Sequence, residues 1–297
     1  MRVLVFGTTG QLGWEVLRRG NAASVTVNGV ARSEADITNR KSVSQIIDRT
    51  PSDVVINAAA YTNVDQAETD SETAMAVNCD GPGFLAEACA NKDLPLIHVS
   101  TDYVFNGQSS RPYREDDPID PLGVYGQSKA RGESRVRNRL DRHVIIRTSW
   151  LYGVHGRNFV KTMLRLGAER QVISVVNDQT GCPTFAGDLA QAIIRAAIVI
   201  HQGGQGLFGT YHFCNLGQVT WYGFAEAIFE LVRGRIPLTV ERVQAITSDQ
   251  YPTPVRRPAY SVLDTTKFTS AFGYAPPHWR DSLATMLEET LVSKSYQ

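Results

Sequence analysis

Short apolar segments alternate with segments of helical periodicity along the first half of the chain. The apolar segments are rich in β-branched and large residues, and we expect strands at residues 2–6, 25–30, 53–60, 96–100 and 143–148. Apolar positions at helical spacing predict helices at residues 13–19, 42–48, 74–91 and 128–140. This alternation predicts an α/β fold of Rossmann type, a doubly wound parallel sheet covered by helices on both faces.

The pattern is less regular after residue 150. Helical spacing recurs at residues 159–165, 188–200, 224–232 and 282–291, and residues 211–215 are expected to form a strand. Glycine- and proline-rich segments separate these elements. We therefore predict an NAD(P)-binding Rossmann domain at residues 1–150 and a smaller, mixed substrate domain at residues 151–297. The segment 185–215 is a candidate to return to the first domain.

The charge balance and the apolar runs exclude several classes of protein. The 297 residues hold 30 basic and 30 acidic side chains, so the formal net charge is zero. A general binder of nucleic acid or of an anionic membrane is usually basic, so we expect neither partner. The first apolar run ends at Gly7, too early for a signal peptide, and no run approaches the ~20 apolar residues of a membrane span. These features are typical of a cytoplasmic protein.

The candidate metal ligands are scattered along the chain. The four cysteines form no C-x-x-C pair and the six histidines show no ligand-like spacing, so we expect reduced thiols and no metal site. Asp188, Glu288 and Glu289 read as solvated charges on helices. A divalent ion such as Mg²⁺ at these acids has no support from the sequence.

A glycine-rich turn follows the first predicted strand. Gly7, Gly10 and Gly13 form a G-x-x-G-x-x-G pattern, and Gln11 and Leu12 stand where a helix is expected to open. Glycines let the backbone approach a diphosphate, and a helix N-terminus offers N–H donors to it. A tight turn without a ligand could use the same glycines. The position after the first strand of an alternating pattern favours a dinucleotide.

The end of the second predicted strand bears on the choice between NAD and NADP. A carboxylate there usually holds the ribose 2′-hydroxyl of NAD, and an arginine accommodates a 2′-phosphate. This chain has Ala31, Arg32 and Ser33 at that place, with Asp36 and Ile37 beyond them near the expected adenine. We therefore predict NADPH as the preferred cofactor. NADH is the alternative if Arg32 is only a solvated loop residue.

A tyrosine–lysine pair is the candidate acid–base centre. Tyr125 and Lys129 are four residues apart, so they share one face of a helix that begins at Tyr125. A tyrosine with its ordinary pKa of ~10 needs a nearby cation to work near neutral pH, and lowering that pKa by ~3 units takes roughly 4 kcal/mol. The Lys129 ammonium has the required sign. Thr101, after the fourth predicted strand, could direct its hydroxyl at the same carbonyl oxygen.

The glycine loop together with Thr101, Tyr125 and Lys129 resembles the extended short-chain dehydrogenase/reductase superfamily. Six ordered sequence blocks narrow the likeness, at residues 57–68, 99–105, 124–129, 147–152, 177–184 and 251–258. In this combination the chain is similar to the dTDP-4-dehydrorhamnose reductases, from residue 1 to about residue 290.

The resemblance implies NADPH-dependent reduction of the C4 keto group of dTDP-4-dehydro-β-L-rhamnose, the last step of dTDP-rhamnose biosynthesis. Tyr125 would protonate the oxyanion, Lys129 would hold the nicotinamide ribose and tune Tyr125, and Thr101 would orient the carbonyl. Many relatives carry an aspartate where this chain has Ala31, which puts the use of NADH in doubt. Cofactor contacts are expected at Gly7, Gly10, Gln11, Leu12, Gly13, Ala31, Arg32, Asp36, Ile37, Ala59, Ala60, Tyr61, Thr62, Tyr125 and Lys129, and substrate contacts at Thr101, Asp102, Trp150 and Arg257.

The substrate side has weaker sequence signals. Trp150 follows the fifth predicted strand, where ligands of doubly wound sheets bind, although a core tryptophan would fit the same place. Arg256 or Arg257 could pair with the substrate diphosphate. Tyr103 follows Asp102, where related sugar-nucleotide dehydratases carry a glutamate, so we do not expect elimination of water.

Two other functions stay open at this point. One is a different enzyme of the superfamily, an epimerase or a GDP-sugar reductase, because only the loops of the second half separate these enzymes. The other is a non-catalytic regulatory subunit on this fold, against which the presence of Thr101, Tyr125 and Lys129 argues. The sequence pattern is compatible with a monomer and with a homodimer.

Overall fold

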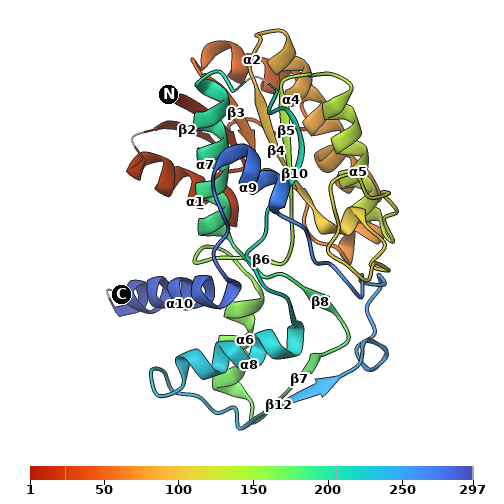
Figure 1. Cartoon of the computed structure of the whole chain (residues 1–297), viewed down its shortest axis with the longest axis vertical. Coiled ribbons are helices and arrows are strands. Elements are labelled where there is room, and N and C mark those ends of the chain that lie inside the picture. The colour runs from red at the N-terminus through yellow and green to blue at the C-terminus, as the bar shows by residue number, and fades with distance from the viewer. Residues whose placement is uncertain (24, 205, 296–297) are drawn as a thin grey trace.

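A six-stranded parallel sheet forms the centre of the larger part of the molecule (Figure 1). The computed structural model describes residues 1–23, 25–204 and 206–295. The strand order is β10-β5-β4-β3-β1-β2, so the order reverses direction at β1. Ligands of doubly wound sheets bind at such a reversal. The strands are β1 (Arg2–Phe6), β2 (Thr26–Val30), β3 (Val54–Asn57), β4 (Leu96–Thr101), β5 (His143–Thr148) and β10 (Gly209–His212).

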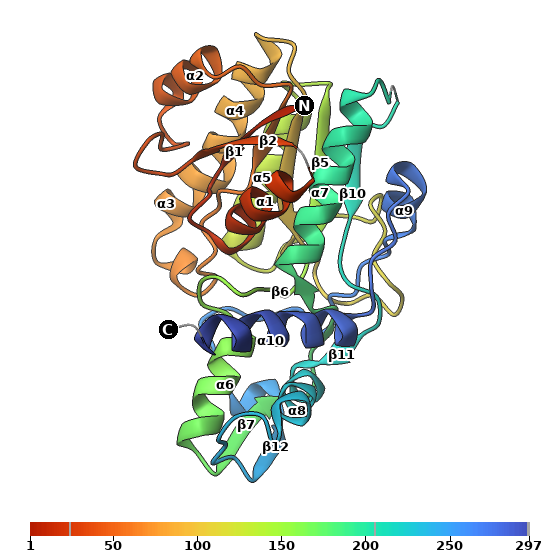
Figure 2. The same ribbon diagram turned by 90° about the vertical axis from the view of Figure 1, so that its left-hand side faces the viewer.

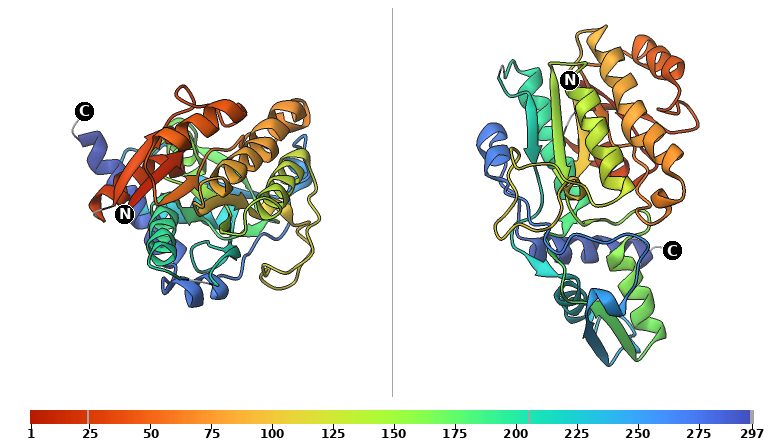
Figure 3. Two further views of the ribbon diagram at one scale, coloured as in Figure 1. Left: turned by 90° about the horizontal axis from the view of Figure 1, so that it is seen from above. Right: turned by 90° about the vertical axis from the view of Figure 1, so that its right-hand side faces the viewer.

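Helices cover both faces of this sheet. Figure 2 looks onto α1 (Gln11–Ala22) and α7 (Ala186–His201), and the right-hand view of Figure 3 looks onto α4 (Gly81–Ala90) and α5 (Val124–Arg137). Helix α2 (Arg40–Arg49) packs on the same face of the sheet as α4. Alternate residues of β1 supply the two cores: Val3 and Val5 pack with α1 and α7, and Leu4 and Phe6 pack with α2 and α4. The predicted α/β fold with a doubly wound sheet is confirmed.

Several predicted boundaries shift for local reasons. β3 ends at Asn57, not at residue 60, because the Asn57 side chain accepts the Ala59 N–H and residues 58–60 turn toward the cavity described below. The predicted helix at 74–91 consists of α3 (Ser71–Met75), a π-helical turn (Ala76–Asp80) and α4. α5 begins at Val124, earlier than the predicted residue 128, which places Tyr125 in its first turn.

The smaller part of the molecule lies below the large sheet in Figures 1 and 2. Its core includes Phe224, Ile228, Leu283 and Met286, all fully buried. The elements are α6 (Phe159–Glu169), α8 (Trp221–Val232), α10 (Trp279–Ser295) and a parallel pair of β7 (Val172–Val176) with β12 (Arg242–Ile246). The sequence pattern missed β7, β12 and α9 (Thr266–Phe272).

The chain crosses between the two parts more than once. After β5, the short strand β6 (Leu151–Tyr152) pairs with β9 (Thr184–Phe185), and β8 (Thr180–Gly181) pairs with β11 (Val219–Thr220). Between these pairs, α7 packs on the large sheet and β10 joins β5 in it. The predicted domain boundaries, at residue 150 and around 185–215, stay predictions.

Two further properties concern the chain as a whole. Within the described ranges, no helix has both the length and the apolar character needed to cross a bilayer. Cys79, Cys89, Cys182 and Cys214 are buried free thiols, as expected for reduced cysteines.

Candidate active site

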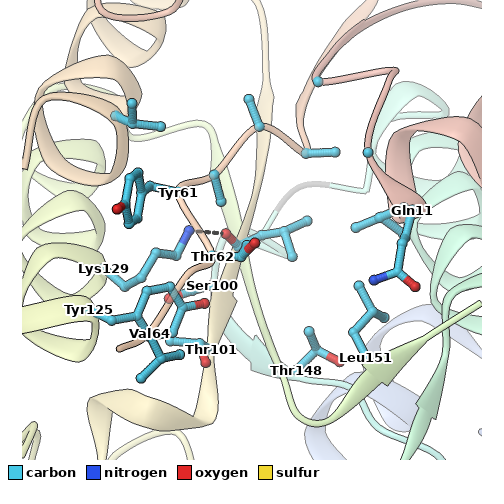
Figure 4. Close-up of a pocket in the computed structure, with 18 of the residues that line it drawn as sticks. Gln11, Tyr61, Thr62, Val64, Ser100, Thr101, Tyr125, Lys129, Thr148 and Leu151 are labelled. Atoms are coloured by element: carbon cyan, nitrogen blue, oxygen red, sulfur yellow. Dashed lines mark hydrogen bonds between the residues drawn. The ribbon is translucent and has the colours of Figure 1, made fainter. Parts of the chain in front are cut away.

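A cavity of about 800 Å³ opens where β1, β3, β4 and β5 end (Figure 4). Figure 4 shows Tyr125 and Lys129 reaching into it from α5, with Gln11 on the opposite side. Two expected residues, Gly13 and Ala31, lie outside its wall. The other candidates line it together: Gly7, Gly10, Gln11, Leu12, Arg32, Asp36, Ile37, Ala59, Ala60, Tyr61, Thr62, Thr101, Asp102, Tyr125, Lys129, Trp150 and Arg257.

The glycine loop leaves the start of α1 open to the cavity. Gly7 has φ +86°, and a Cβ on it would lie 2.5 Å from the Ala59 nitrogen. A Cβ on Gly13 would lie 2.2 Å from the Gly7 oxygen, so Gly13 packs the helix against the loop and does not reach the cavity. α1 begins after Gly10 with no side-chain cap and no acidic residue in its first turn. This uncapped helix start fits the diphosphate of a dinucleotide.

At the end of β2, Arg32 is already paired. Its Nε donates to Asp36 Oδ2 at 2.9 Å, and the arginine side chain is 75% exposed. Burial opposes ionisation of Asp36, but hydrogen bonds from Thr38 and Arg32 outweigh it and lower the pKa of that carboxyl. The Ala31 N–H donates to Glu34 Oε2 at 2.7 Å, so Glu34 is a nearby carboxylate that the sequence analysis did not weigh. A 2′-phosphate would compete with Asp36 for Arg32.

Lys129 lies one helical turn after Tyr125 and is almost fully buried. Its Nζ donates to the Val99 carbonyl oxygen of β4 at 2.7 Å, as the dashed line in Figure 4 marks. Burial lowers the pKa of Lys129 to about 8, against the opposing attraction of Glu133. A side chain poised in this way can carry a positive charge near neutral pH and lose it in mild base.

Tyr125 stays protonated at neutral pH. Burial raises the pKa of its phenol above the ordinary value, the Thr101 hydroxyl acts in the opposite sense, and Asp102 and Tyr103 add to the increase. The tuning of Tyr125 by Lys129 stays a prediction. A neutral phenol is the form that can donate a proton.

Thr101 and Asp102 form a buried polar pair at the end of β4. Thr101 Oγ1 donates to Asp102 Oδ1 at 2.9 Å and accepts the Tyr103 N–H at 3.2 Å. Burial raises the pKa of Asp102 to about 6, although its hydrogen bonds oppose the shift. The two hydrogen bonds therefore fix the position of the Thr101 side-chain oxygen at the cavity wall.

Arg257 reaches the cavity from the loop that precedes α9. It donates to the Tyr103 hydroxyl at 3.2 Å and pairs with Asp65 at 2.8 Å. The Tyr103 ring in turn meets Tyr125 edge-on, with centroids 5.5 Å apart. Of the two arginines considered for the substrate diphosphate, Arg257 lines the cavity and Arg256 does not.

Trp150 lines the cavity with a partner that the sequence analysis missed. Its indole stacks on Trp221, the first residue of α8, with ring centroids 3.6 Å apart and planes 8° apart. Trp150 has φ +46°, and a Cβ on Gly181 would lie 2.5 Å from its ring. A non-glycine residue in the left-handed region is strained and often functional. Trp150 is half-buried at the cavity wall, and its role in substrate binding stays a prediction.

Asn78 is a second missed residue, buried in the π-helical turn. It accepts the Tyr61 N–H and donates to the Tyr61 oxygen, both at 2.9 Å, and donates to Ser128 Oγ at 3.0 Å. These bonds attach the cavity wall at Tyr61 to helix α5. In the sequence, Asn78 is a polar residue within the predicted helix at residues 74–91. The pattern therefore assigns it to that helix and not to the candidate site.

A buried ion pair lies next to Lys129. Arg147 donates to Glu133 twice, from Nε at 2.9 Å and from Nη2 at 2.8 Å, and both side chains are at most 1% exposed. Burial alone would raise the pKa of Glu133, but Arg147 lowers it to about 2. Glu133 follows Lys129 by one turn of α5, so a permanent negative charge lies beside the lysine.

The acids considered for a divalent ion have other partners. Asp188 accepts from Asn215 Nδ2 at 2.7 Å, Glu288 pairs with Arg235, and Glu289 pairs with Arg18 and Arg19. Among the residues that the structure describes, no three His, Cys, Asp or Glu side chains are grouped as metal ligands would be.

Comparison with known proteins agrees with this geometry. A family model described as RmlD substrate binding domain matches residues 1–292. A dTDP-4-dehydrorhamnose reductase of Aggregatibacter actinomycetemcomitans is 46% identical, over 95% of this chain and 97% of the relative. The reductase of Escherichia coli strain K12 is 39% identical, over 99% of both chains.

Solved structures give the same relationship. A dTDP-4-dehydrorhamnose reductase from Clostridium acetobutylicum superposes with a TM-score of 0.90 at 35% identity, covering 97% of this chain and 99% of that one. The reductase from Bacillus anthracis, solved in complex with NADP, matches with the same score, identity and coverage. A UDP-glucose 4-epimerase from Thermus thermophilus, at 21% identity and a TM-score of 0.78, shares the fold alone. The chain belongs to the dTDP-4-dehydrorhamnose reductase family.

Proposed function

We propose that this chain reduces the C4 keto group of dTDP-4-dehydro-β-L-rhamnose to dTDP-L-rhamnose with NADPH, the last step of dTDP-rhamnose biosynthesis. The observation that carries the proposal is the cavity that joins an uncapped helix start to a protonated tyrosine, a buried lysine and a threonine hydroxyl. Relatives across the full chain are named for this reaction. The complex of one solved relative contains NADP.

The two ends of the cavity suit a dinucleotide. At one end the first turn of α1 faces the space without a cap, and Arg32 and Asp36 lie beyond it. At the other end are Lys129 and Tyr125. NADPH, when bound with its diphosphate at α1, supplies a hydride to the keto carbon.

Tyr125 donates the proton that completes the reduction. Its raised pKa keeps the phenol protonated until negative charge develops on the C4 oxygen. To orient the same oxygen, the Thr101 hydroxyl turns its one proton from Asp102 Oδ1 to the C4 oxygen when substrate binds. Lys129, fixed by the Val99 carbonyl, retains N–H groups for a ribose hydroxyl and places a positive charge beside the reacting groups.

Trp150 and Trp221 form the apolar part of the substrate wall. The apolar face of a 6-deoxy sugar can pack on an indole, and the stacked pair excludes water from that side of the carbonyl. Arg257, adjacent to Tyr103, is the residue we assign to the substrate diphosphate. We also propose a cytoplasmic location and either a monomer or a homodimer, which sedimentation of the purified protein would distinguish.

The test is an assay with matched substrates. Purified protein is mixed with NADPH and either dTDP-linked or GDP-linked 4-keto sugar, and NADPH absorbance is followed. We expect rapid oxidation with the dTDP sugar and formation of dTDP-rhamnose. Oxidation only with the GDP sugar would indicate a GDP-sugar reductase. Formation of an epimer without NADPH consumption would indicate an epimerase, and inactivity with both sugars would favour a regulatory subunit.

A further inference from the structure

The loop at residues 153–158, here called the strap, connects β6 to α6 and lies on the glycine loop (Figure 2). His155 Nε2 lies 3.1 Å from the Thr9 carbonyl oxygen, so this nitrogen carries the proton and donates. Asn158 Nδ2 donates to Gln11 Oε1 at 2.9 Å. The strap is thus attached to both sides of the Gly10 turn.

Ring stacking and a glycine bring the strap still closer. The His155 ring stacks on Trp14 of α1, with centroids 5.4 Å apart and planes 10° apart. Gly156 has φ +75°, and a Cβ there would lie 3.1 Å from Gln11 Cγ. Gly156 and the next residue, Arg157, both line the cavity beside the start of α1.

Arg157 differs from the other cations of the cavity wall. Arg32 is paired with Asp36, Arg257 is paired with Asp65, and Lys129 donates to the Val99 carbonyl. Within the described part of the chain, Arg157 has neither an ion pair nor a side-chain hydrogen bond. It is therefore an uncompensated positive charge at the place where the glycine loop offers its N–H donors.

We propose that the strap covers the diphosphate of the bound dinucleotide and that Arg157 is a binding residue for that diphosphate. This inference rests on the proposed function. The start of a helix supplies only about half a positive charge, which leaves most of the charge on a diphosphate uncompensated. An arginine can bind phosphate oxygens through two parallel N–H donors. The sugar nucleotide also carries a diphosphate, but the contacts of the strap to Thr9 and Gln11 favour the cofactor.

Direct binding, without turnover, tests the assignment. NADPH, NADH and dTDP are each titrated by calorimetry into the wild type, Arg157→Gln, Arg157→Lys and Arg32→Gln. Because both dinucleotides share the diphosphate, Arg157→Gln should weaken NADPH and NADH alike, by roughly tenfold, with dTDP unchanged. Arg157→Lys should retain part of the affinity. Arg32→Gln should weaken NADPH and leave NADH almost unchanged.

The matched control is Arg170→Gln, an exposed arginine at the far end of α6 that makes the same change in net charge. It should bind all three ligands like the wild type. Wild-type affinity of Arg157→Gln for both dinucleotides, or a loss confined to dTDP, would overturn the assignment. Thermal melting of each variant would identify a loss caused by misfolding.

Hydrogen exchange gives an independent readout of the strap. NADPH should slow exchange at the amides of residues 153–158 in the wild type, and dTDP alone should not. Unchanged exchange in the presence of saturating NADPH would overturn the covering role. NADPH binding with strap protection but without reduction of the dTDP sugar would overturn the proposed function and leave the strap inference intact.

Discussion

Glu133 and Arg147 form a two-point buried ion pair, with Nε–Oε1 and Nη2–Oε2 distances of 2.9 and 2.8 Å. Because Glu133 attracts the Lys129 ammonium, it holds the pKa of that lysine at about 8 against the effect of burial. Through Glu133, the buried ion pair therefore influences the protonation state of Lys129, the proposed active-site lysine.

We expect Glu133→Gln to move the alkaline limb of kcat/KM to lower pH. Without the negative charge, the pKa of Lys129 falls further below its ordinary value and the lysine loses its proton earlier as pH rises. Removing one partner of a buried pair should also cost about 3–5 kcal/mol of stability. Glu133→Asp, which keeps the charge, is the control in pH–rate profiles. A destabilised Glu133→Gln variant with an unmoved alkaline limb would reduce the role of Glu133 to structure alone.

Tyr125→Phe removes the proposed proton donor and little else. Its kcat for keto-sugar reduction should fall by about 10²–10⁴-fold, the usual contribution of a positioned acid. NADPH affinity should change little, because Lys129 keeps its bond to the Val99 carbonyl. Stopped-flow NADPH oxidation and calorimetric binding separate these effects. An undiminished kcat would exclude Tyr125 as the donor.

Much of the candidate site was predictable because its signals are local. The glycine loop and the Tyr125–Lys129 pair each occupy a short sequence segment. The first lies between β1 and α1, and the second lies on the helix that comes after β4. The carboxyl ends of the parallel strands meet at one edge of the sheet, where ligands bind. The fold could be predicted because short apolar segments alternate with segments of helical periodicity along the chain. The ends of helices and strands were predicted less accurately, because capping and packing decide them. At the π-helical turn, for example, the Asn78 backbone oxygen packs against Gly132 of α5, only 2.0 Å from where a Cβ on that glycine would lie.

What the sequence hid are contacts between distant segments. Trp221 reaches Trp150 from a helix in the smaller part of the molecule, and no local pattern marks that meeting. Arg147 lies in a strand and Glu133 on a helix rich in charges, and neither local pattern shows that the two side chains meet. β12 was missed because Arg242, Gln244 and Ala245 are exposed, which weakens its apolar pattern.

Asp102 should make the protein less stable as pH rises. Its folded-state pKa is about 6 against an ordinary 3.8, so between roughly pH 4 and 6 the folded state holds a proton that the unfolded state has lost. Stability contributed by this group is therefore present at low pH and lost through that window, up to about 3 kcal/mol. Asp102→Asn should melt at a higher temperature than the wild type at neutral pH and at a similar one near pH 4. An equal melting temperature for both proteins at neutral pH would contradict this account.

The stack of Trp150 on Trp221 should control affinity for the sugar. Trp221→Leu removes one ring, and Gly181→Ala places a methyl group 2.5 Å from the Trp150 ring, so both should disrupt the stack. We expect KM for the keto sugar to rise by roughly tenfold with a smaller change in kcat, because packing of an aromatic wall is lost while Tyr125 and Thr101 keep their places.

Circular dichroism reports the stack independently of activity. Two indoles 3.6 Å apart couple their transitions, so both variants should lose a dichroism couplet that Trp14→Phe, which removes an unrelated indole, retains. Loss of the couplet accompanied by a rise in KM would link the strained backbone at Trp150 to sugar recognition. Loss of the couplet with KM unchanged would show that the stack stabilises the fold without contacting the substrate, and the φ of +46° at Trp150 would then need another explanation.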